Sequence, residues 1–471
     1  MRNSILISIA IILFNFSVSA QLDYLYNDSI PHSALLLSQY IQYPSVTGNE
    51  RDAGLFLASI AMQKGLYVTL LTDHTDTLNF VASLYPLELK KPNIILLNHI
   101  DVVPASNIDE FTYEPFSGTI ADGQIWGRGA IDNKGMAVMQ LLGMERFVEL
   151  AKKKDLPYNV TFLSVSGEET GGYTGAKIVS ERFIELLNPF VFYGEGGTGI
   201  PGLLKNDPER KVFTISTTFK RRLFLNLTLN MNTTGHGSVP PRSYAPQEMI
   251  NSMNSLISRK SKIEFSKTTR LMFYELGRLE GGLRGLGLRN TRLFRPVVNK
   301  SIRKDEMIHS LFVNTVTITG INTPYGNVNQ IPQSISVILD CRLLPDVQTD
   351  VFIADLLKIL SNDDLDVNII HEDIHAAPTQ LGQYYTLMER ALDKVYPDCG
   401  VVPVLMPASN DNNYFRAVGV PSYGILPVLM QMEHILSIHN IDERIPIKAL
   451  EEGVEVYYEL LKEFFEPYYS N

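Results

Sequence analysis

The first half of the chain alternates between short apolar runs and longer amphipathic stretches. Residues 94–97, 160–165 and 190–194 are short apolar runs, and the signature that follows each contains an acidic residue. Such runs are typical of buried strands, whereas residues 137–153 place apolar positions at helical spacing. Strands that alternate with helices from residue 21 to residue 212 predict an α/β fold with a mostly parallel sheet. In such sheets, ligands are bound at the carboxyl ends of the strands.

The pattern changes near residue 214. Residues 222–232 alternate strictly, with leucines and one methionine on one face and mostly polar residues on the other, which is typical of a half-solvated antiparallel strand. We therefore predict a larger α/β domain of residues 21–213 and 376–471, interrupted by a smaller α+β domain of residues 214–375. The later elements expected are a helix at 245–258, strands between 315 and 343, a helix at 351–360, a strand at 365–370 and a helix at 447–465.

Residues 260–310 form a longer segment than a compact inserted domain requires. The segment is basic and rich in glycine, as in the run RLEGGLRGLGLRNTR. We expect a surface loop here, with anion binding as the alternative that its Gly and Arg content allows.

Residues 1–20 are typical of a cleavable signal peptide. A positive residue, Arg2, precedes an apolar stretch, and small residues end at Ala20, after which we expect cleavage. The alternative is a membrane anchor, but the apolar run is short for a bilayer span of about 20 residues. We therefore expect a secreted or periplasmic protein whose mature form has no membrane span.

Composition narrows the class of protein further. The chain has 471 residues, of which 45% are hydrophobic and 20% charged, as in soluble globular proteins. The net charge of −10 gives no reason to expect a nucleic acid or an anionic membrane as partner. Two cysteines make no disulfide framework, and Cys341 lies on the apolar face of an alternating strand, so we expect a buried free thiol.

Ligand-type side chains follow several of the predicted strands. A His-x-Asp pair, His99 and Asp101, suits a metal ligand whose second ring nitrogen is fixed by a carboxylate, although the pair alone is weak support. Adjacent Glu168 and Glu169 repel each other unless they are solvated or share a cation. Two imidazoles and three carboxylates suit two zinc-like ions bridged by one carboxylate. The ligand candidates are His99, Asp132, Glu169, Glu195 and His439. Glu168 is then the spare carboxylate and the candidate general base.

The motifs HIDVVP, GRGAIDNKG, SGEETGG, GEGG, TTGHGSVPP and IHNIDERI resemble those of the M20 metallopeptidases in order and spacing. This resemblance implies two zinc ions, with cobalt or manganese as other options. It implies that Asp132 bridges the ions, and that the peptide bond between Asp132 and Asn133 is cis. The remaining roles implied are His99 and Glu195 on one ion, Glu169 and His439 on the other, Glu168 as base and Asp101 as the residue that orients His99.

The resemblance also assigns roles to the inserted domain. It implies that His236 stabilises the oxyanion, that Asn329 and Arg342 bind the substrate carboxylate, and that the domain forms a lid through which the protein is a homodimer. An arginine fork suits a carboxylate because it can bind it bidentately. The chain departs from the family pattern at Lys220, where Gly is common, and at Asn410 and Asn413, where Thr and Arg are common.

These features predict an exported di-metal hydrolase that cleaves a peptide or N-acyl amide bond beside a free carboxylate, with water as nucleophile. No GxSxG elbow is present in the sequence, and the GRG at 127–129 does not continue as a phosphate-binding loop motif. The alternatives are an M28-type aminopeptidase and a catalytically inactive binding protein on the same fold. His434 receives no role because it lies five residues before the better-matched His439. The other histidines have no acidic partner at ligand spacing and also receive no role: His32, His74, His309, His371 and His375.

Overall fold

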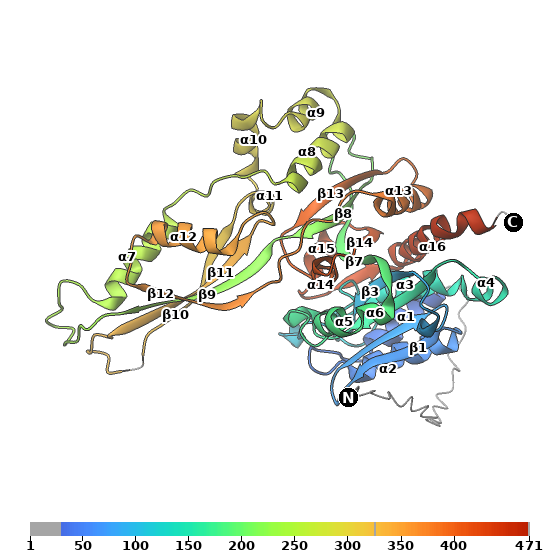
Figure 1. Cartoon of the computed structure of the whole chain (residues 1–471), viewed down its shortest axis with the longest axis horizontal. Helices are drawn as coiled ribbons and strands as arrows, with labels where there is room; N and C mark the ends of the chain where they lie inside the picture. Colours follow the sequence, from blue (N-terminus) through green and yellow to red (C-terminus); the bar gives the residue numbers. More distant parts are fainter. Residues whose placement is uncertain (1–29, 325, 470–471) are drawn as a thin grey trace, which may run out of the picture.

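An eight-stranded sheet forms the centre of the larger domain in the computed structural model, which describes residues 30–324 and 326–469 (Figure 1). The strand order is β1-β2-β6-β3-β7-β14-β8-β13, and the pairs from β6 to β14 are parallel. The predicted α/β fold with a mostly parallel sheet is therefore confirmed. The strands of this sheet are β1 (Tyr67–Asp73), β2 (Leu78–Ser83), β3 (Asn93–His99), β6 (Asn159–Val165), β7 (Pro189–Ile200), β8 (Val212–Phe219), β13 (Gly400–Met406) and β14 (Ser422–Leu429).

Helices cover both faces of this sheet, which explains why its central strands are continuously apolar. In β3, Ile94 and Leu96 pack into one core, while Ile95 and Leu97 pack into the core on the opposite face. On the first face lie α1 (His32–Ile41), α2 (Arg51–Gln63), α3 (Lys134–Glu145), α4 (Val148–Lys153), α13 (Gln383–Val395) and α16 (Ile447–Tyr469). On the second lie α5 (Ala176–Arg182), α6 (Ile184–Leu187) and α14 (Asn412–Ala417).

The smaller domain is an antiparallel sheet of order β10-β11-β9-β12 (Figure 1). Its strands are β9 (Arg221–Asn230), β10 (Thr315–Asn322), β11 (Ser334–Leu343) and β12 (Leu365–Glu372). Leu223 to Leu229 of β9 and Ile335 to Leu343 of β11 bury every second side chain against α7 (Ala245–Ile257) and α12 (Thr349–Leu360). The alternation predicted for both strands is confirmed, and Cys341 is a buried free thiol.

The expectation of a surface loop at residues 260–310 is wrong. The segment forms α8 (Lys267–Glu280), α9 (Gly282–Arg289), α10 (Arg295–Ile302) and α11 (Glu306–Ser310). Apolar side chains on these helices form a separate core with Val212, Val402 and Val404 of the large sheet. Residues 260–310 therefore pack on the edge of the larger domain, although along the sequence they fall between strands of the inserted domain.

The two domains are joined where β8 leaves the large sheet and β9 enters the small one. Lys220 lies between these strands and is buried. Its ammonium donates to the Ser310 carbonyl and to Thr315, at 2.9 and 3.2 Å. This lysine, at a position where the family commonly has Gly, thus ties the linker to α11 and β10. The remaining elements are β4 (Ile120–Ala121), β5 (Gln124–Trp126), α15 (Met432–Ser437), β15 (Arg444–Pro446) and 3₁₀ turns at Leu87–Leu89, Ile108–Glu110 and Glu168–Thr170.

The predicted signal peptide lies outside the described residues. Within residues 30–324 and 326–469, no helix combines the length and the apolar character needed to cross a bilayer.

Candidate metal centre

The end of β3 places His99 in the floor of a carboxylate cluster. Its Nε2 lies 3.0 Å from Oδ1 of Asp132 and 3.4 Å from Oε2 of Glu195. Its Nδ1 lies 2.9 Å from the main-chain carbonyl of Asp101 and 3.4 Å from that residue's carboxylate, so the carbonyl is the closer acceptor. Either contact fixes the ring so that Nε2 faces the carboxylates.

Asp132 joins this group to a second one. Its other oxygen, Oδ2, lies 3.1 Å from Nε2 of His439, which in turn lies 3.1 Å from Oε1 of Glu169. In each of the two groups, one ligand atom per residue lies within 4.8 Å of all the others. Asp132 is common to both groups and offers a different oxygen to each imidazole, as a bridging carboxylate does. The peptide bond from Asp132 to Asn133 is cis, as the resemblance implied.

The charges of the cluster favour occupation by cations. Burial opposes the charged imidazole of His99, yet its hydrogen bonds to Asp101, Asp132 and Glu195 raise its pKa well above the usual value. Asp132 and then Glu169 raise the pKa of His439 to about 10. A neutral ring would turn its Nε2 lone pair toward carboxylate oxygens, so each site needs either a proton or a cation. The five side chains therefore fit two divalent ions with N and O ligands.

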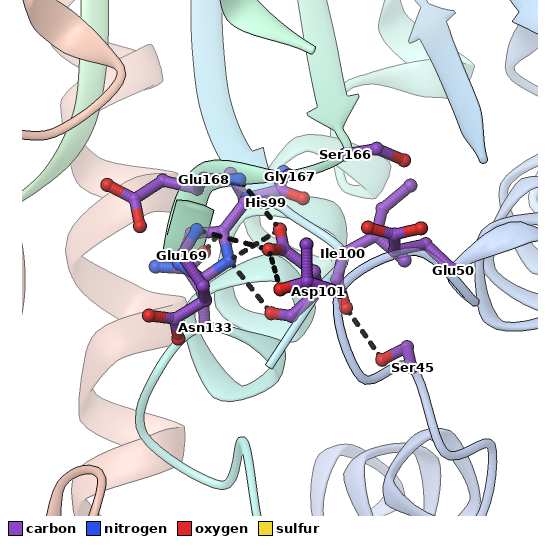
Figure 2. Close-up of polar contacts among 12 residues, drawn as sticks. Ser45, Glu50, His99, Ile100, Asp101, Asn133, Ser166, Gly167, Glu168 and Glu169 are labelled. Carbon is purple, nitrogen blue, oxygen red and sulfur yellow. Dashed lines mark hydrogen bonds and ion pairs between the residues drawn. The ribbon is translucent and has the colours of Figure 1, made fainter. Parts of the chain in front are cut away.

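Asp101 lies beside His99 and the Glu168–Glu169 turn (Figure 2). It is fully buried, and its two oxygens accept the main-chain N–H groups of Glu168 and Glu169 at 3.0 and 3.1 Å. Thr47 donates to the same carboxylate at 2.8 Å. The hydrogen bond and charge of His99, and then the hydrogen bonds from Thr47 and the Glu169 N–H, lower the pKa of Asp101 despite its burial. Asp101 therefore positions the Glu168–Glu169 turn as well as His99, a role that the His-x-Asp motif alone did not reveal.

Glu443 is a site residue that the sequence analysis missed. It is buried, and its Oε2 accepts from Arg128 at 2.9 Å and from the Gly129 N–H at 3.0 Å. Its Oε1 accepts the N–H groups of Ile131 and Asp132 at 2.9 and 3.1 Å. One carboxylate therefore fixes the loop that carries Asp132. The available signal was its place in IHNIDER, four residues after His439.

Glu195 lies within β7 rather than just beyond its end, as the apolar run had suggested. The pairing of β7 with β14 shifts in register between Gly194 and Gly197, so Glu195 sits at an irregularity in the strand. Asn410 and Asn412 both donate their side-chain N–H to the Glu195 carbonyl at 2.8 Å. Asn410, one of the departures from the family pattern, thus holds this irregular backbone in place.

Glu168 has none of the imidazole contacts of Glu169. Burial, and then the charge of Glu195, raises its pKa well above the usual value for a glutamate. Glu168, His99, Glu195 and Asp411 line one small cavity, and Oδ2 of Asp411 is buried there without a hydrogen-bond partner among the described residues. Burial raises the pKa of Asp411 to about 8. Glu168 is thus a half-buried carboxylate among other acidic groups, which raises its basicity as a proton acceptor.

Two of the three candidate residues of the inserted domain lie far from this cluster, whereas Arg342 pairs in register with Arg222 at the start of β9. His236 Nε2 and Asn329 Nδ2 lie 2.8 Å apart, in the segments that follow β9 and precede β11, and Figure 1 shows these ends of the two strands far from the large domain. Arg342 lies near the other end of β11, where it pairs with both oxygens of Asp340 at 2.7 and 2.9 Å. The structure therefore brings two of these residues together and separates them from the third.

The distance from His236 to the metal cluster follows from strand length. Arg222, at the start of β9, lies beside the turn after Glu169, since a Cβ on Gly171 would be 3.4 Å from its Nη2. From Arg222 to Asn230 the strand rises through eight residue-to-residue steps, or about 26 Å. His236 follows at the far end, so it cannot contact the cluster of its own chain in this arrangement.

One histidine that received no role does have an acidic partner. His371 Nε2 lies 2.9 Å from Asp373, which also binds Arg222, and its Nδ1 contacts Tyr173. The expectation that His371 lacks an acidic partner is therefore wrong, since His371 and Asp373 have the same His-x-Asp spacing as His99 and Asp101. These side chains link the ends of β9 and β12 to the loop after Glu169.

Comparisons with known proteins give a consistent family. The model of peptidase family M20/M25/M40 matches residues 95–463. A probable carboxypeptidase S-like 2 of Dictyostelium discoideum is 28% identical and covers 80% of this chain and 72% of its own length. An N-fatty-acyl-amino acid synthase/hydrolase, PM20D1, of Mus musculus is 26% identical and covers 81% of this chain and 76% of its own.

Solved structures show the same fold. The M20 family metallo-carboxypeptidase Sso-CP2 from Sulfolobus solfataricus has a TM-score of 0.68 at 19% identity, covering 92% of this chain and 99% of its own. The di-peptidase Dug1p from Saccharomyces cerevisiae has a TM-score of 0.63 at 16% identity, covering 93% and 96%. These likenesses extend over both domains.

Proposed function

The chain belongs to peptidase family M20/M25/M40, and we propose that it is a di-metal hydrolase of peptide or N-acyl amide bonds beside a free carboxylate. Membership of this family identifies the chain as a metal-dependent hydrolase of C–N bonds. The observation that carries the finer proposal is the geometry of Asp132, whose two oxygens each face the Nε2 of a different histidine at 3.0 and 3.1 Å. The family assignment sets aside the alternative of an M28-type aminopeptidase.

The five ligands divide between two ions. His99 and Glu195 would hold one ion, Glu169 and His439 the other, and Asp132 both. Zinc suits this set of imidazole and carboxylate ligands, with cobalt or manganese as substitutes. When bound, such ions supply Lewis acidity that polarises the scissile carbonyl and makes water more acidic.

Glu168 is the proposed general base. It is adjacent to a ligand but makes no contact with either imidazole, so its carboxylate is available to accept a proton from water. The same carboxyl then donates that proton to the leaving nitrogen, which completes cleavage of the C–N bond without a covalent intermediate. Asp101 contributes by fixing the main chain of Glu168 and Glu169 at 3.0 and 3.1 Å.

The inserted domain supplies the remaining groups. We assign His236 to the oxyanion, and Asn329 and Arg342 to the substrate carboxylate. Because His236 lies at the far end of its own domain, it would serve the site of a partner chain in a homodimer. The proposed substrates are dipeptides, short C-terminal peptides and N-acyl amino acids. The curated relatives' names, carboxypeptidase S-like and N-fatty-acyl-amino acid synthase/hydrolase, lie within this range.

Export completes the proposal. A signal peptide cut after Ala20 predicts that the mature protein begins at Gln21. N-terminal sequencing of protein produced by its own cell would test this, and an intact Met1 in the secreted fraction would refute it.

The decisive experiment is a substrate panel tested with full-length protein loaded with zinc. Dipeptides and N-acyl amino acids with short and long acyl chains are each paired with the same compound carrying a carboxamide in place of its free carboxylate. We expect cleavage only of the free acids, and loss of that cleavage in Glu168→Gln. Cleavage of both members of each pair would refute carboxylate recognition. Two bound metals with no cleavage of any compound would favour an inactive binding protein.

A further inference from the structure

Residues 281–304, in and around α9 and α10, have a charge opposite to that of the whole chain. They contain seven basic residues and no acidic residue, whereas the chain carries a net charge of −10. The basic residues are Arg284, Arg289, Arg292, Arg295, Lys300, Arg303 and Lys304. A local charge of this size is hidden in the total, and it is sufficient to attract an anionic partner.

The same segment exposes large apolar side chains. Leu283, Leu293 and Val297 have exposed fractions of 89%, 76% and 70%. They are not needed for the local core, because Val298 and Ile302 on the inward face of α10 are already buried in it. Single exposed leucines are ordinary, but several of them among arginines in one short segment mark an interaction surface.

The segment that carries these exposed residues is supported by α8, against which α9 packs closely. Helices α8 and α9 pack with their backbones in contact, since a Cβ on Gly285 would lie 2.3 Å from the Gly277 carbonyl. Between these helices, Gly281 has a φ of 63°, and Glu280 accepts the Lys205 N–H at 2.8 Å. Figure 1 shows α9 and α10 at the outer edge of the molecule, beyond α8, which contacts β13.

The arginines are available to a partner. Within the part of the chain that the structure describes, Arg289, Arg292 and Arg295 form no ion pair. Arg284 makes only a longer contact with Glu280, at 3.6 Å. Unpaired guanidinium groups beside exposed leucines are an unusual combination for a surface that contacts only water. We call Leu283, Leu293, Val297, Arg289, Arg292 and Arg295 the basic apolar surface.

We propose that the basic apolar surface docks on a lipid surface that carries anionic headgroups. Arginines would bind lipid phosphates, and the leucines and the valine would enter the boundary between headgroups and acyl chains, as amphipathic helices at interfaces do. A nucleic acid would match the arginines but would leave the apolar side chains in water. The docking is peripheral, because no helix of the described residues could span the bilayer.

This inference does not depend on the proposed function, since docking needs neither the metals nor a substrate. If both hold, an amphipathic N-acyl substrate that partitions into the same lipid surface would be concentrated beside the enzyme. Binding and hydrolysis are measured separately, so the failure of one is distinguishable from the failure of the other.

The test is co-sedimentation of the full-length protein with vesicles. Vesicles of phosphatidylcholine alone are compared with vesicles in which part of the lipid is phosphatidylglycerol. We expect binding only to the anionic vesicles, weakened by added salt. The triple variant Arg289→Gln, Arg292→Gln, Arg295→Gln should bind roughly a hundredfold more weakly, since each basic residue contributes about fivefold near an anionic surface.

The apolar contribution is tested separately with Leu283→Gln, Leu293→Gln and Val297→Gln combined. We expect at least roughly a tenfold loss, because partial burial of three such side chains contributes more than that factor. This variant decides between lipid and other polyanions. If it binds vesicles as well as the wild type does, the arginines act alone and the lipid proposal is overturned.

Matched control variants lie on other surfaces. Lys153→Gln, Lys358→Gln and Lys448→Gln combined remove three exposed positive charges elsewhere. Met62→Gln, Leu70→Gln and Leu89→Gln remove three exposed apolar side chains. Both controls should bind like the wild type, and every variant should melt like it. Equal losses in the controls and the test variants, or no binding of the wild type to anionic vesicles, would refute the proposal.

Discussion

Replacing Glu443 with glutamine tests whether a single buried carboxylate positions the candidate bridging ligand. The carboxylate accepts four hydrogen bonds, from Arg128, Gly129, Ile131 and Asp132, at 2.9 to 3.1 Å. Glutamine has nearly the same shape but replaces one accepting oxygen with an N–H donor. Whichever way the amide turns, two of the four donors face another donor.

The expected loss can be worked out from these contacts. Hydrogen bonds to a charged group contribute about 1.5–3 kcal/mol each, so losing two predicts about 3–6 kcal/mol. Removing one partner of a buried ion pair costs about 3–5 kcal/mol, and this contribution overlaps with the first. We therefore expect a loss of about 4 kcal/mol in the free energy of unfolding. Because the loop also carries Asp132, metal affinity should fall about 10–100-fold, as it does when a residue supporting a ligand is lost.

Two measurements separate stability from positioning. Urea unfolding gives the free energy of unfolding. Competition with a chelator, carried out without urea, gives the metal affinity of the folded protein. Glu280→Gln is the matched control, because Glu280 is also a buried glutamate but lies on α8, outside the metal cluster. It should lose stability and keep its metal affinity. If Glu443→Gln loses stability yet binds metal like the wild type, then Glu443 does not position Asp132.

Three further results are expected. Elemental analysis of zinc-reconstituted protein should give two ions per chain, and full activity with one ion would refute the bridging role of Asp132. Glu168→Gln should keep both metals and lose at least about a hundredfold in kcat, whereas Glu169→Gln should lose metal; equal metal content in the two variants would refute the division of roles. Burial, and then the charge of Arg342, lowers the pKa of Lys220 from 10.5 to about 7. Between these two pH values Lys220 is protonated in the unfolded chain but largely neutral in the folded one, so the free energy of unfolding of the wild type should rise with pH. Lys220→Met should remove up to about 1.4 kcal/mol of that rise per pH unit in urea unfolding, and an unchanged slope would refute it.

The central strands and the candidate ligands could be predicted because each has a strong local signal. Strand β3 is buried on both faces, so its residues form a continuous apolar run that ends at His99. The residues that the sequence did not reveal act through distant partners. Glu443 accepts from main-chain groups more than 300 residues earlier, and backbone donors leave no trace in the identity of the residues that carry them.

Residues 260–310 show a second reason why sequence-based prediction of the structure failed. Glycines at 281, 282, 285 and 287 suggest a loop when local propensity is read alone. In the structure, Gly285 allows α9 to approach α8, and the packing of α8 on β13 stabilises helices that the local sequence would not favour. Tertiary contacts thus override propensity, and net charge summed over the chain concealed the basic character of this segment.

His236 provides the sharpest test of how the two domains cooperate. The residue follows β9, whose start lies beside the turn after Glu169 and whose end is about 26 Å away. Its side chain pairs with Asn329 at 2.8 Å, so both would reach a metal cluster only in a second chain. The edges of the small sheet at β10 and β12 are open to such a partner among the described residues.

Mixing two inactive variants should therefore restore activity. In a heterodimer of His236→Ala and Glu168→Ala, the site with an intact Glu168 receives the intact His236 of the other chain, whereas the second site lacks both. Random exchange makes about half of the dimers mixed, so the mixture should recover about a quarter of wild-type activity. The matched control mixes Glu168→Ala with Glu169→Gln, two changes in one cluster, which leave in each heterodimer one site without its base and one without a ligand. If the first mixture stays as inactive as this control after verified subunit exchange, His236 acts within its own chain, and the domains must then close by a movement that this arrangement does not contain.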